Sequence, residues 1–376
     1  MRISRRSMIL GAGTASVALV GSGAVWRVMR QPTTAITPWA IDPKPPADIR
    51  LDALRYAILA PNPHNRQPWL IRLVGTDQVE LTCDLAKRLP ETDPFDRQII
   101  MGFGTFIELA RIAAAERGYG VDVLPFPDGA PQPRLDARPV ARLVFRKDAS
   151  VARDPLFATV TQRHTNRNLY DPTPPTPRQL AMIRQQDAMT SADPKLIAQV
   201  RALAVRAMTT ETVTHRTFME SVNVMRIGAA EMDAMPDGLP IGGPLVEGLH
   251  ALGMLDQAQL ADPSTSSFKM GLKQVQDSCG SVPAVVWIAT PGNSRAEQLD
   301  AGRRYVRAQL RATTLGLWMH PLSQALQEYP EMRADYARVH AMFGLTGSQR
   351  LQMLARIGIA APAGPAPRWP LEKHLI

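Results

Sequence analysis

The feature that most constrains the fold is a stretch of about twenty residues with helical periodicity, set among short β-branched runs. From Arg97 to Arg117 the residues Ile, Phe, Leu and Ala recur at helical spacing, and Gly118 and Gly120 end the pattern. Such a stretch predicts a buried helix. The neighbouring β-branched runs predict strands over residues 70–74, 79–83, 121–124 and 140–145. The first part of the chain is therefore expected to form an α+β unit that ends near Arg146.

The rest of the chain is also expected to mix helices and strands. Helices are predicted from about Leu156 into Arg163, from 178 to about 225, over 296–315 and around 334–342, and strands over 284–289 and 351–359. Residues 228–275 are rich in Met, Gly and Pro and show little periodicity, which is typical of a covering lid. The 376 residues, 45% of them hydrophobic, suffice for one large domain or two intimately packed ones.

The N-terminus indicates export. Ser4–Leu10 contains paired arginines and leads into a modestly apolar stretch from Met8 to about Trp26, which is typical of a twin-arginine signal. The basic first turn of a buried helix is the alternative, but no acid precedes Asp42 and the glycines disfavour a soluble helix. We expect the folded protein to be exported by the twin-arginine translocase, to the periplasm or the outer face of the cytoplasmic membrane. Whether the segment is cleaved or kept as an anchor stays open.

Charge and cysteine content exclude several classes of function. Of the net charge of +9, five charges come from arginines within the first 30 residues, and the rest of the chain has no Lys/Arg run interleaved with aromatics. Nucleic-acid binding is therefore not expected. Cys83 and Cys279 are expected to be buried free thiols, with a single disulfide in an oxidising compartment as the alternative. The histidines show no ligand spacing, so no metal is expected.

Two short motifs carry the functional information. Ala60–Trp69 is a turn rich in proline and asparagine, which could present backbone donors and a flat wall to an aromatic ring. Arg163–Arg167 reads Arg-His-Thr-Asn-Arg, and guanidinium and hydroxyl groups grip a phosphate by charge-assisted hydrogen bonds. A solvated helix face that carries the two arginines is the alternative interpretation. Read together, the two motifs look like the two halves of one flavin site.

With these motifs the chain resembles the nitroreductase-like FMN flavoprotein superfamily, specifically its fused, two-repeat branch related to the mycobacterial Acg proteins. Further similar segments are Asp93–Gly104, Ala301–Gln324, Leu354–Gly358 and Pro367–Leu371. The resemblance implies an α+β nitroreductase-like fold in which two tandem repeats form an intramolecular pseudo-dimer, with central antiparallel sheets flanked by helices. The expected divisions are a signal or anchor (1–30), a proline-rich tether (31–49), a first repeat (50–150) and a second repeat (151–376) with a lid-like insertion (228–275).

The resemblance also implies where the cofactor lies. Ordinary nitroreductases are homodimers in which the phosphate motif and the Asn-x-Gln-Pro-Trp-type turn at one FMN come from different subunits. Here each motif occurs once in the chain. We therefore expect a single FMN site between the repeats of a pseudo-dimer formed within one chain. Whether the protein is a monomer stays open.

Residue roles follow from the same resemblance. The residues expected to hold the FMN phosphate and nearby oxygens are Arg163, Thr165, Arg167 and, from the tail, Arg368. Those expected to line the isoalloxazine are Pro61, Asn62, Pro63 and Asn65. Ser323 and Gln324 match the loop whose backbone N–H faces flavin N5, where the family commonly has Glu-Gly. His320 beside that loop is a candidate proton donor, because imidazole titrates in the useful range. For His64, contact with flavin or substrate stays open, and Trp69 is expected to pack in the core.

The expected function is that of an exported FMN oxidoreductase, in which reduced flavin passes a hydride or electrons to an unidentified small acceptor. A non-catalytic protein that sequesters or stores FMN, its ring sealed by residues 228–275, is the alternative from another class. A structural protein without cofactor is the third. Neither the electron donor nor the acceptor can be named from the sequence.

Overall fold

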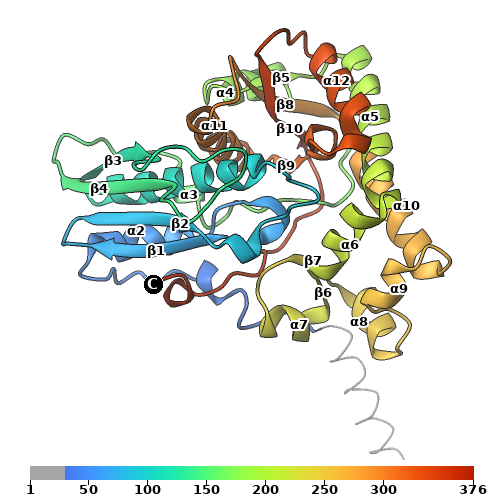
Figure 1. Ribbon diagram of the computed structural model, residues 1–376, viewed down its shortest axis with the longest axis horizontal. Helices are drawn as coiled ribbons and strands as arrows, with labels where there is room; N and C mark the ends of the chain where they lie inside the picture. Colours follow the sequence, from blue (N-terminus) through green and yellow to red (C-terminus); the bar gives the residue numbers. More distant parts are fainter. Residues whose placement is uncertain (1–29) are drawn as a thin grey trace, which may run out of the picture.

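Two four-stranded antiparallel sheets with the same strand order form the framework of the protein. The computed structural model describes residues 30–376, and the proposed export signal lies outside the described residues (Figure 1). The first sheet has the order β1-β2-β4-β3 and the second the order β5-β8-β10-β9. The strands are β1 (Trp69–Val74), β2 (Gln78–Cys83), β3 (Tyr119–Pro125), β4 (Ala141–Lys147), β5 (Met189–Ser191), β8 (Ala284–Thr290), β9 (Trp318–Pro321) and β10 (Arg350–Gly358).

The helices extend this correspondence to two complete repeats. The first runs α2 (Ile49–Ala57), β1, β2, α3 (Arg97–Glu116), β3, β4, and the second runs α4 (Pro177–Arg184), β5, β8, α11 (Arg295–Thr314), β9, β10. Neighbouring strands pair antiparallel throughout both sheets. The predicted α+β fold of two tandem repeats is confirmed, and the predicted strands and the helices α3 and α11 lie within one or two residues of their expected bounds.

The two long helices cross at a pair of glycines. Gly104 and Gly302 each stand seven residues after the arginine that begins their helix, α3 and α11. A Cβ on Gly104 would lie 2.0 Å from the carbonyl oxygen of Leu299, and one on Gly302 would lie 2.0 Å from that of Met101. The reciprocal contact shows that the repeats are related by a pseudo-twofold axis through this crossing, where only glycine lets the backbones approach.

The arginines that begin these helices reach across the interface between the repeats. Arg97 donates to the carbonyl of Leu326 at 2.7 Å, and Arg295 donates to that of Phe95 at 2.7 Å. Helix α3 is apolar enough to cross a membrane, but 89% of its apolar window is buried inside the protein. It is the buried helix that the sequence predicts.

The second repeat carries a large insertion where the first has a hairpin turn. Residues 75–77 join β1 to β2, whereas residues 192–283 join β5 to β8. The insertion contains α5 (Pro194–Val213), α6 (His215–Asn223), β6 (Met225–Ile227), α7 (Gly228–Ala234), β7 (Leu239–Ile241), α8 (Pro244–Ala251), α9 (Gln257–Ala261) and α10 (Ser266–Gly280). Its helix α5 packs against the second sheet, and Figure 1 shows α7, α8 and α9 extending away from both sheets. It starts well before residue 228, and its Met- and Gly-rich part is more helical than the composition indicates.

Two predicted helices are wrong. The expected helix over 178–225 is divided by β5, because Asp187 has a φ of 56° and Asp193 caps a new helix at Leu196 N, 2.8 Å away. The expected helix into Arg163 is a single 3-10 turn over Phe157–Thr159. The chain then extends, and Thr165 forms a parallel bridge with Met319 of β9. The predicted C-terminal helix is confirmed as α12 (Arg333–Met342).

Candidate functional site

The Ala60–Trp69 motif folds into a tight turn pressed against α3. His64, Asn65 and Gln67 all have positive φ, between 45° and 54°, a conformation that asparagine tolerates better than most residues. The amide oxygen of Asn62 accepts from the backbone N–H of Gln67 at 2.7 Å and so closes the turn. A Cβ on Gly102 of α3 would lie 3.2 Å from that of Asn62, so glycine makes room for the turn.

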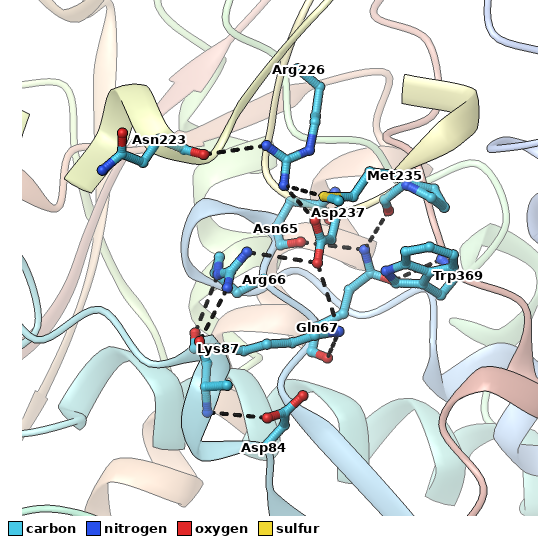
Figure 2. A network of polar contacts seen from close by, with 12 residues as sticks. Asn65, Arg66, Gln67, Asp84, Lys87, Asn223, Arg226, Met235, Asp237 and Trp369 are labelled. Carbon is cyan, nitrogen blue, oxygen red and sulfur yellow. Dashed lines mark hydrogen bonds and ion pairs between the residues drawn. The ribbon is translucent and has the colours of Figure 1, made fainter. Parts of the chain in front are cut away.

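The insertion and the C-terminal tail hold this turn from two sides (Figure 2). Gln67 donates from its amide to the carbonyl of Pro236 at 2.7 Å, and the N–H of Gly238 donates to the carbonyl of Asn65 at 3.1 Å. From the tail, the N–H of Trp369 donates to the amide oxygen of Gln67 at 2.9 Å. Asn65 and Gln67 are buried by these contacts. The turn is therefore fixed before any ligand binds.

A buried carboxylate in the insertion forms ion pairs with three cations around the same turn. Asp237 lies 2.9 Å from Arg226, 3.6 Å from Arg66 and 3.7 Å from Lys87, and Figure 2 shows their charged groups converging. Asp237 is only 5% exposed. Because Arg66 and Lys87 belong to the first repeat, this cluster ties the insertion to the first repeat. The sequence analysis missed it, since the partners are far apart in the chain.

Two of the predicted phosphate ligands have a different role. Arg163 donates to the carbonyl of Leu59 at 2.8 Å and to the side chain of Gln309 at 3.0 Å. Arg368 donates to the carbonyls of Leu59 and Ala60 at 3.1 and 3.0 Å, and its guanidinium also binds the side chain of Asn65. Both arginines are buried. They satisfy the open carbonyls just beyond α2, which a helix end requires, so their donors are largely used within the protein.

Arg167, the other arginine of the motif, is free of such contacts. Its guanidinium has no hydrogen bond or ion pair to any residue from 30 to 376. The side chain is solvent-exposed, yet desolvation by surrounding protein lowers its pKa. Thr165, half-buried nearby in sequence, accepts from Gln309 at 3.5 Å.

The two motifs lie close together, since Arg163 of the second donates to the carbonyl of Leu59, just before the first. Burial, and then the positive charge of Arg167, lower the pKa of His64 to about 4. Burial lowers the pKa of His320 well below its usual value, and the charges of Arg356 and Arg167 lower it further. His64 belongs to the turn of the first repeat, whereas Arg167 and His320 belong to the second. The predicted convergence of the two motifs is therefore observed in the fold.

Arg356 orients the ring of His320 by a hydrogen bond. It was not among the predicted site residues. It donates from Nε to Nδ1 of His320 at 3.1 Å, so the neutral imidazole carries its hydrogen on Nε2. Arg356 is fully buried, stacks 4.1 Å over the ring of Tyr170 and donates to the hydroxyl of Ser278 at 2.9 Å. An arginine within a predicted core strand was the signal available in the sequence. His320 can thus donate a hydrogen bond from Nε2, but as a neutral ring it is not a ready acid.

The loop after β9 contains the remaining predicted residues. Ser323 and Gln324 are half-buried where the 3-10 turn Gln324–Leu326 begins. Arg97 of the first repeat holds this turn through Leu326 and pairs with Glu328 at 3.2 Å. Trp69 is fully buried, and its indole donates to His374 at 3.3 Å, which confirms it as a core residue.

Several buried polar atoms around the two motifs have no partner among the described residues. They are Nε of Arg163, the hydroxyl of Tyr305, Nδ1 of His64 and Nε2 of His164. Tyr305 lies near both arginines of the motif, whose charges act to lower the raised pKa of its hydroxyl. Buried polar atoms without partners are costly, so this cluster is suited to a polar ligand.

The charges of the region point to an anion. Within residues 30–376 four arginines here have no carboxylate partner, namely Arg163, Arg167, Arg356 and Arg368. Burial lowers the pKa of Arg368 and of Arg356, and the charges of Arg163 and Arg167, respectively, lower them further. Cations this close in a desolvated setting repel one another unless an anion offsets them. The arrangement is suited to a phosphate.

Other features of the described residues offer no competing site. No group of three or more His, Cys, Asp or Glu side chains between residues 30 and 376 could hold a metal ion. Cys83 and Cys279 are buried free thiols. An open recess at the edge of the first sheet contains none of the predicted residues, and its Arg72 and Arg142 are already paired with Glu80.

Two related sequences match this chain along most of its length. Two sequences from strains of Mycobacterium tuberculosis, provisionally named NAD(P)H nitroreductases, are 28% identical over 339 residues, covering 88% of this chain and 91% of theirs. No family model matches the chain.

Solved structures give partial matches at low similarity. An FMN-dependent nitroreductase from Mycobacterium smegmatis, in complex with NADPH, is 15% identical, with a TM-score of 0.32 over 54% of this chain and 91% of its own. An FMN- and NADPH-dependent nitroreductase from a Sphingopyxis strain is 16% identical, with a TM-score of 0.34 over 58% and 97%. Over nearly the full length of both chains this protein is therefore similar to the two provisionally named nitroreductases, and its two equivalent repeats agree with a nitroreductase-like fold.

Proposed function

We propose that this protein is an FMN-dependent oxidoreductase whose single flavin lies between the two repeats, with its phosphate at Arg167. The observation that carries the proposal is the guanidinium of Arg167, which is desolvated by the surrounding protein and makes no hydrogen bond or ion pair with residues 30–376. A phosphate would accept from its planar fork of donors. The names of the relatives and solved structures, which include FMN and NAD(P)H nitroreductases, support the choice of cofactor.

The residues present fit this cofactor. Besides Arg167, the unpartnered hydroxyl of Tyr305 and Nε of Arg163 are donors with no other use in the described structure. Charge-assisted hydrogen bonds contribute about 1.5–3 kcal/mol each. Thr165 adds a hydroxyl from the same motif. In this proposal Arg163 and Arg368 act mainly by fixing the end of α2, and thereby the turn from Pro61 to Asn65 that lines the ring.

The chain also supplies electrostatics and hydrogen bonding toward the reacting end. When bound, FMN supplies the two-electron chemistry, while the protein sets its position and potential. The positive charges of Arg167 and Arg356 favour a cofactor that gains negative charge on reduction. Arg356 holds His320 as the Nε2–H tautomer. Because the ring is neutral, the proposal gives His320 the role of a hydrogen-bond donor from Nε2 and not that of a proton donor.

The setting of this activity is also proposed. We infer that the acceptor is a small molecule stacked on the ring, and that the protein is exported folded by the twin-arginine translocase to the periplasm or the outer face of the cytoplasmic membrane. One chain contains both motifs, which supports a complete site in a monomer. The basic, apolar N-terminal sequence supports export.

A flavin-binding comparison tests the proposal. Protein from cytoplasmic expression should absorb at about 450 nm as a flavoprotein. Arg167→Ala should weaken FMN binding by about 2–4 kcal/mol, or 30- to 1,000-fold, and leave the affinity for riboflavin, which lacks the phosphate, unchanged. Arg146→Ala, at an exposed ion pair in the first sheet, is the matched control and should bind FMN like the wild type. Equal FMN affinity in Arg167→Ala and wild type would overturn the phosphate assignment.

One observation favours FMN storage as a second candidate. The turn that would line the ring is covered by the insertion through Pro236 and Gly238 and by the tail through Trp369. A covered ring exchanges slowly and reacts poorly with acceptors. Chemically reduced, protein-bound FMN should be reoxidised by quinones or nitroaromatics faster than free FMN if the protein is an oxidoreductase. No acceleration together with slow flavin exchange would support storage.

A further inference from the structure

A buried carboxyl group lies against the loop that follows β9. Glu211 is on α5, in the insertion, and is only 7% exposed. Its Oε2 accepts from the amide of Gln327 at 2.7 Å, and its Oε1 lies 3.4 Å from the hydroxyl of Ser221 on α6. The side chain of Gln324 also donates to it. Glu211 therefore contacts both ends of the short segment that begins beside Ser323.

No cation is among the contacts of Glu211 in the described residues. The titratable groups that face it are Glu220 on α6, Cys279 on α10 and Tyr329 after the loop. Burial, with a smaller contribution from the negative charge of Glu220, raises the pKa of Glu211 to about 7, although the hydrogen bonds that it accepts oppose this shift. An unpaired carboxyl in such a place changes its charge near neutral pH.

The same loop is held from the opposite side by the first repeat. Arg97 donates to the carbonyl of Leu326 at 2.7 Å and pairs with Glu328. Residues 324–328 thus lie between Arg97 and Glu211. The loop follows β9, whose His320 lies near enough to Arg167 to be affected by its charge. A change in charge at Glu211 is therefore transmitted to the edge of the proposed flavin site by the amides of Gln324 and Gln327.

We propose that Glu211 is a positioning residue for the loop of residues 323–327 and takes up a proton when flavin bound in the adjacent site is reduced. The inference rests on the proposed function. With dithionite as the reductant, two electrons enter the flavin together with one proton, and the flavin becomes anionic. The new negative charge favours protonation of the Glu211 carboxylate, so the complex takes up a second proton from solvent wherever Glu211 was ionised.

The midpoint potential of the bound flavin, measured between about pH 5.5 and 8.5, tests this inference. In the wild type the potential should fall twice as steeply with pH above about pH 7 as below it, because two protons rather than one accompany two electrons. Glu211→Gln keeps an acceptor oxygen for the amide of Gln327 but cannot ionise, and it should lose the break. The control Glu247→Gln replaces an equally buried carboxyl of the insertion, which accepts from the N–H of Ala229, and should keep it.

A measurement without flavin separates the possible failures. Difference infrared spectra of wild type and Glu211→Gln should show a protonated carboxyl at pH 6 that is lost at pH 8.5. Identical potential profiles in the two proteins, or no such carboxyl, would overturn the role of Glu211 while FMN binding stands. Absence of FMN binding by the wild type would instead overturn the proposed function, and this inference with it.

Discussion

A methyl group added at the crossing of α3 and α11 tests whether the two repeats pack as closely as described. In Gly302→Ala the new Cβ would lie 2.0 Å from the carbonyl oxygen and 2.8 Å from the carbonyl carbon of Met101. Both atoms belong to helix backbone, which cannot rotate away as a side chain can. Relief requires the two helices to separate by about 1 Å, and this would disturb the whole interface.

The expected cost follows from two opposing effects. Overpacking of a well-packed core costs about 1–3 kcal/mol, and a clash between two backbones belongs at the upper end. Replacing glycine by alanine within a helix returns about 1 kcal/mol. We therefore expect Gly302→Ala to lower the free energy of unfolding by about 2 kcal/mol. Gly104→Ala, with its Cβ 2.0 Å from the carbonyl oxygen of Leu299, should cost a similar amount.

Urea denaturation followed by circular dichroism measures these changes. Gly271→Ala is the matched control, because its Cβ would meet only the side chain of Leu260 at 3.8 Å in helix α10, and it should stabilise by about 0.5–1 kcal/mol. The double variant should cost less than the sum of the single ones, since one separation relieves both clashes. Wild-type stability in both single variants would refute the close crossing.

Further predictions concern the turn and the buried histidines. Asp237→Asn leaves three cations without their carboxylate, so it should destabilise the protein by about 3–5 kcal/mol and speed limited proteolysis within the insertion. Burial lowers the pKa of His374 to about 3 and that of His64 to about 4, so the unfolded chain binds more protons below pH 6.5. The part of the stability that depends on His374, measured as the difference in urea midpoint between wild type and His374→Gln, should be full above pH 6.5 and fall toward pH 4. Arg368→Met should weaken FMN and riboflavin binding alike, unlike Arg167→Ala, because it loosens the turn and not the phosphate contact.

The sequence predicts those helices and strands whose buried face appears as a regular spacing of apolar residues. Helix α3 and the strands around it follow from spacing alone, because one face of each is buried. The region 178–225 misleads, since α4, α5 and α6 share a helical pattern and the three-residue strand between the first two is too short to register. The boundary depends on pairing with β8, which is far along the chain.

The sequence predicts the location of the site better than it predicts the role of each residue in it. Two motifs from different repeats meet as expected, and Arg167 presents free donors. Residue type alone cannot tell that Arg163 is committed to the carbonyl of Leu59, because that depends on where α2 ends in space. Nor could spacing reveal Arg356 behind His320 or Glu211 behind the loop, which are contacts between distant segments.

The one-sided insertion has an evolutionary consequence. In a homodimer each change in the gene appears on both subunits, so a hairpin that lengthens in one must lengthen in the other. A duplicated and fused chain is released from that constraint, and here only one of two equivalent hairpins has grown into six helices and a small parallel sheet. Each half can then specialise separately, one shielding the shared interface and the other remaining compact.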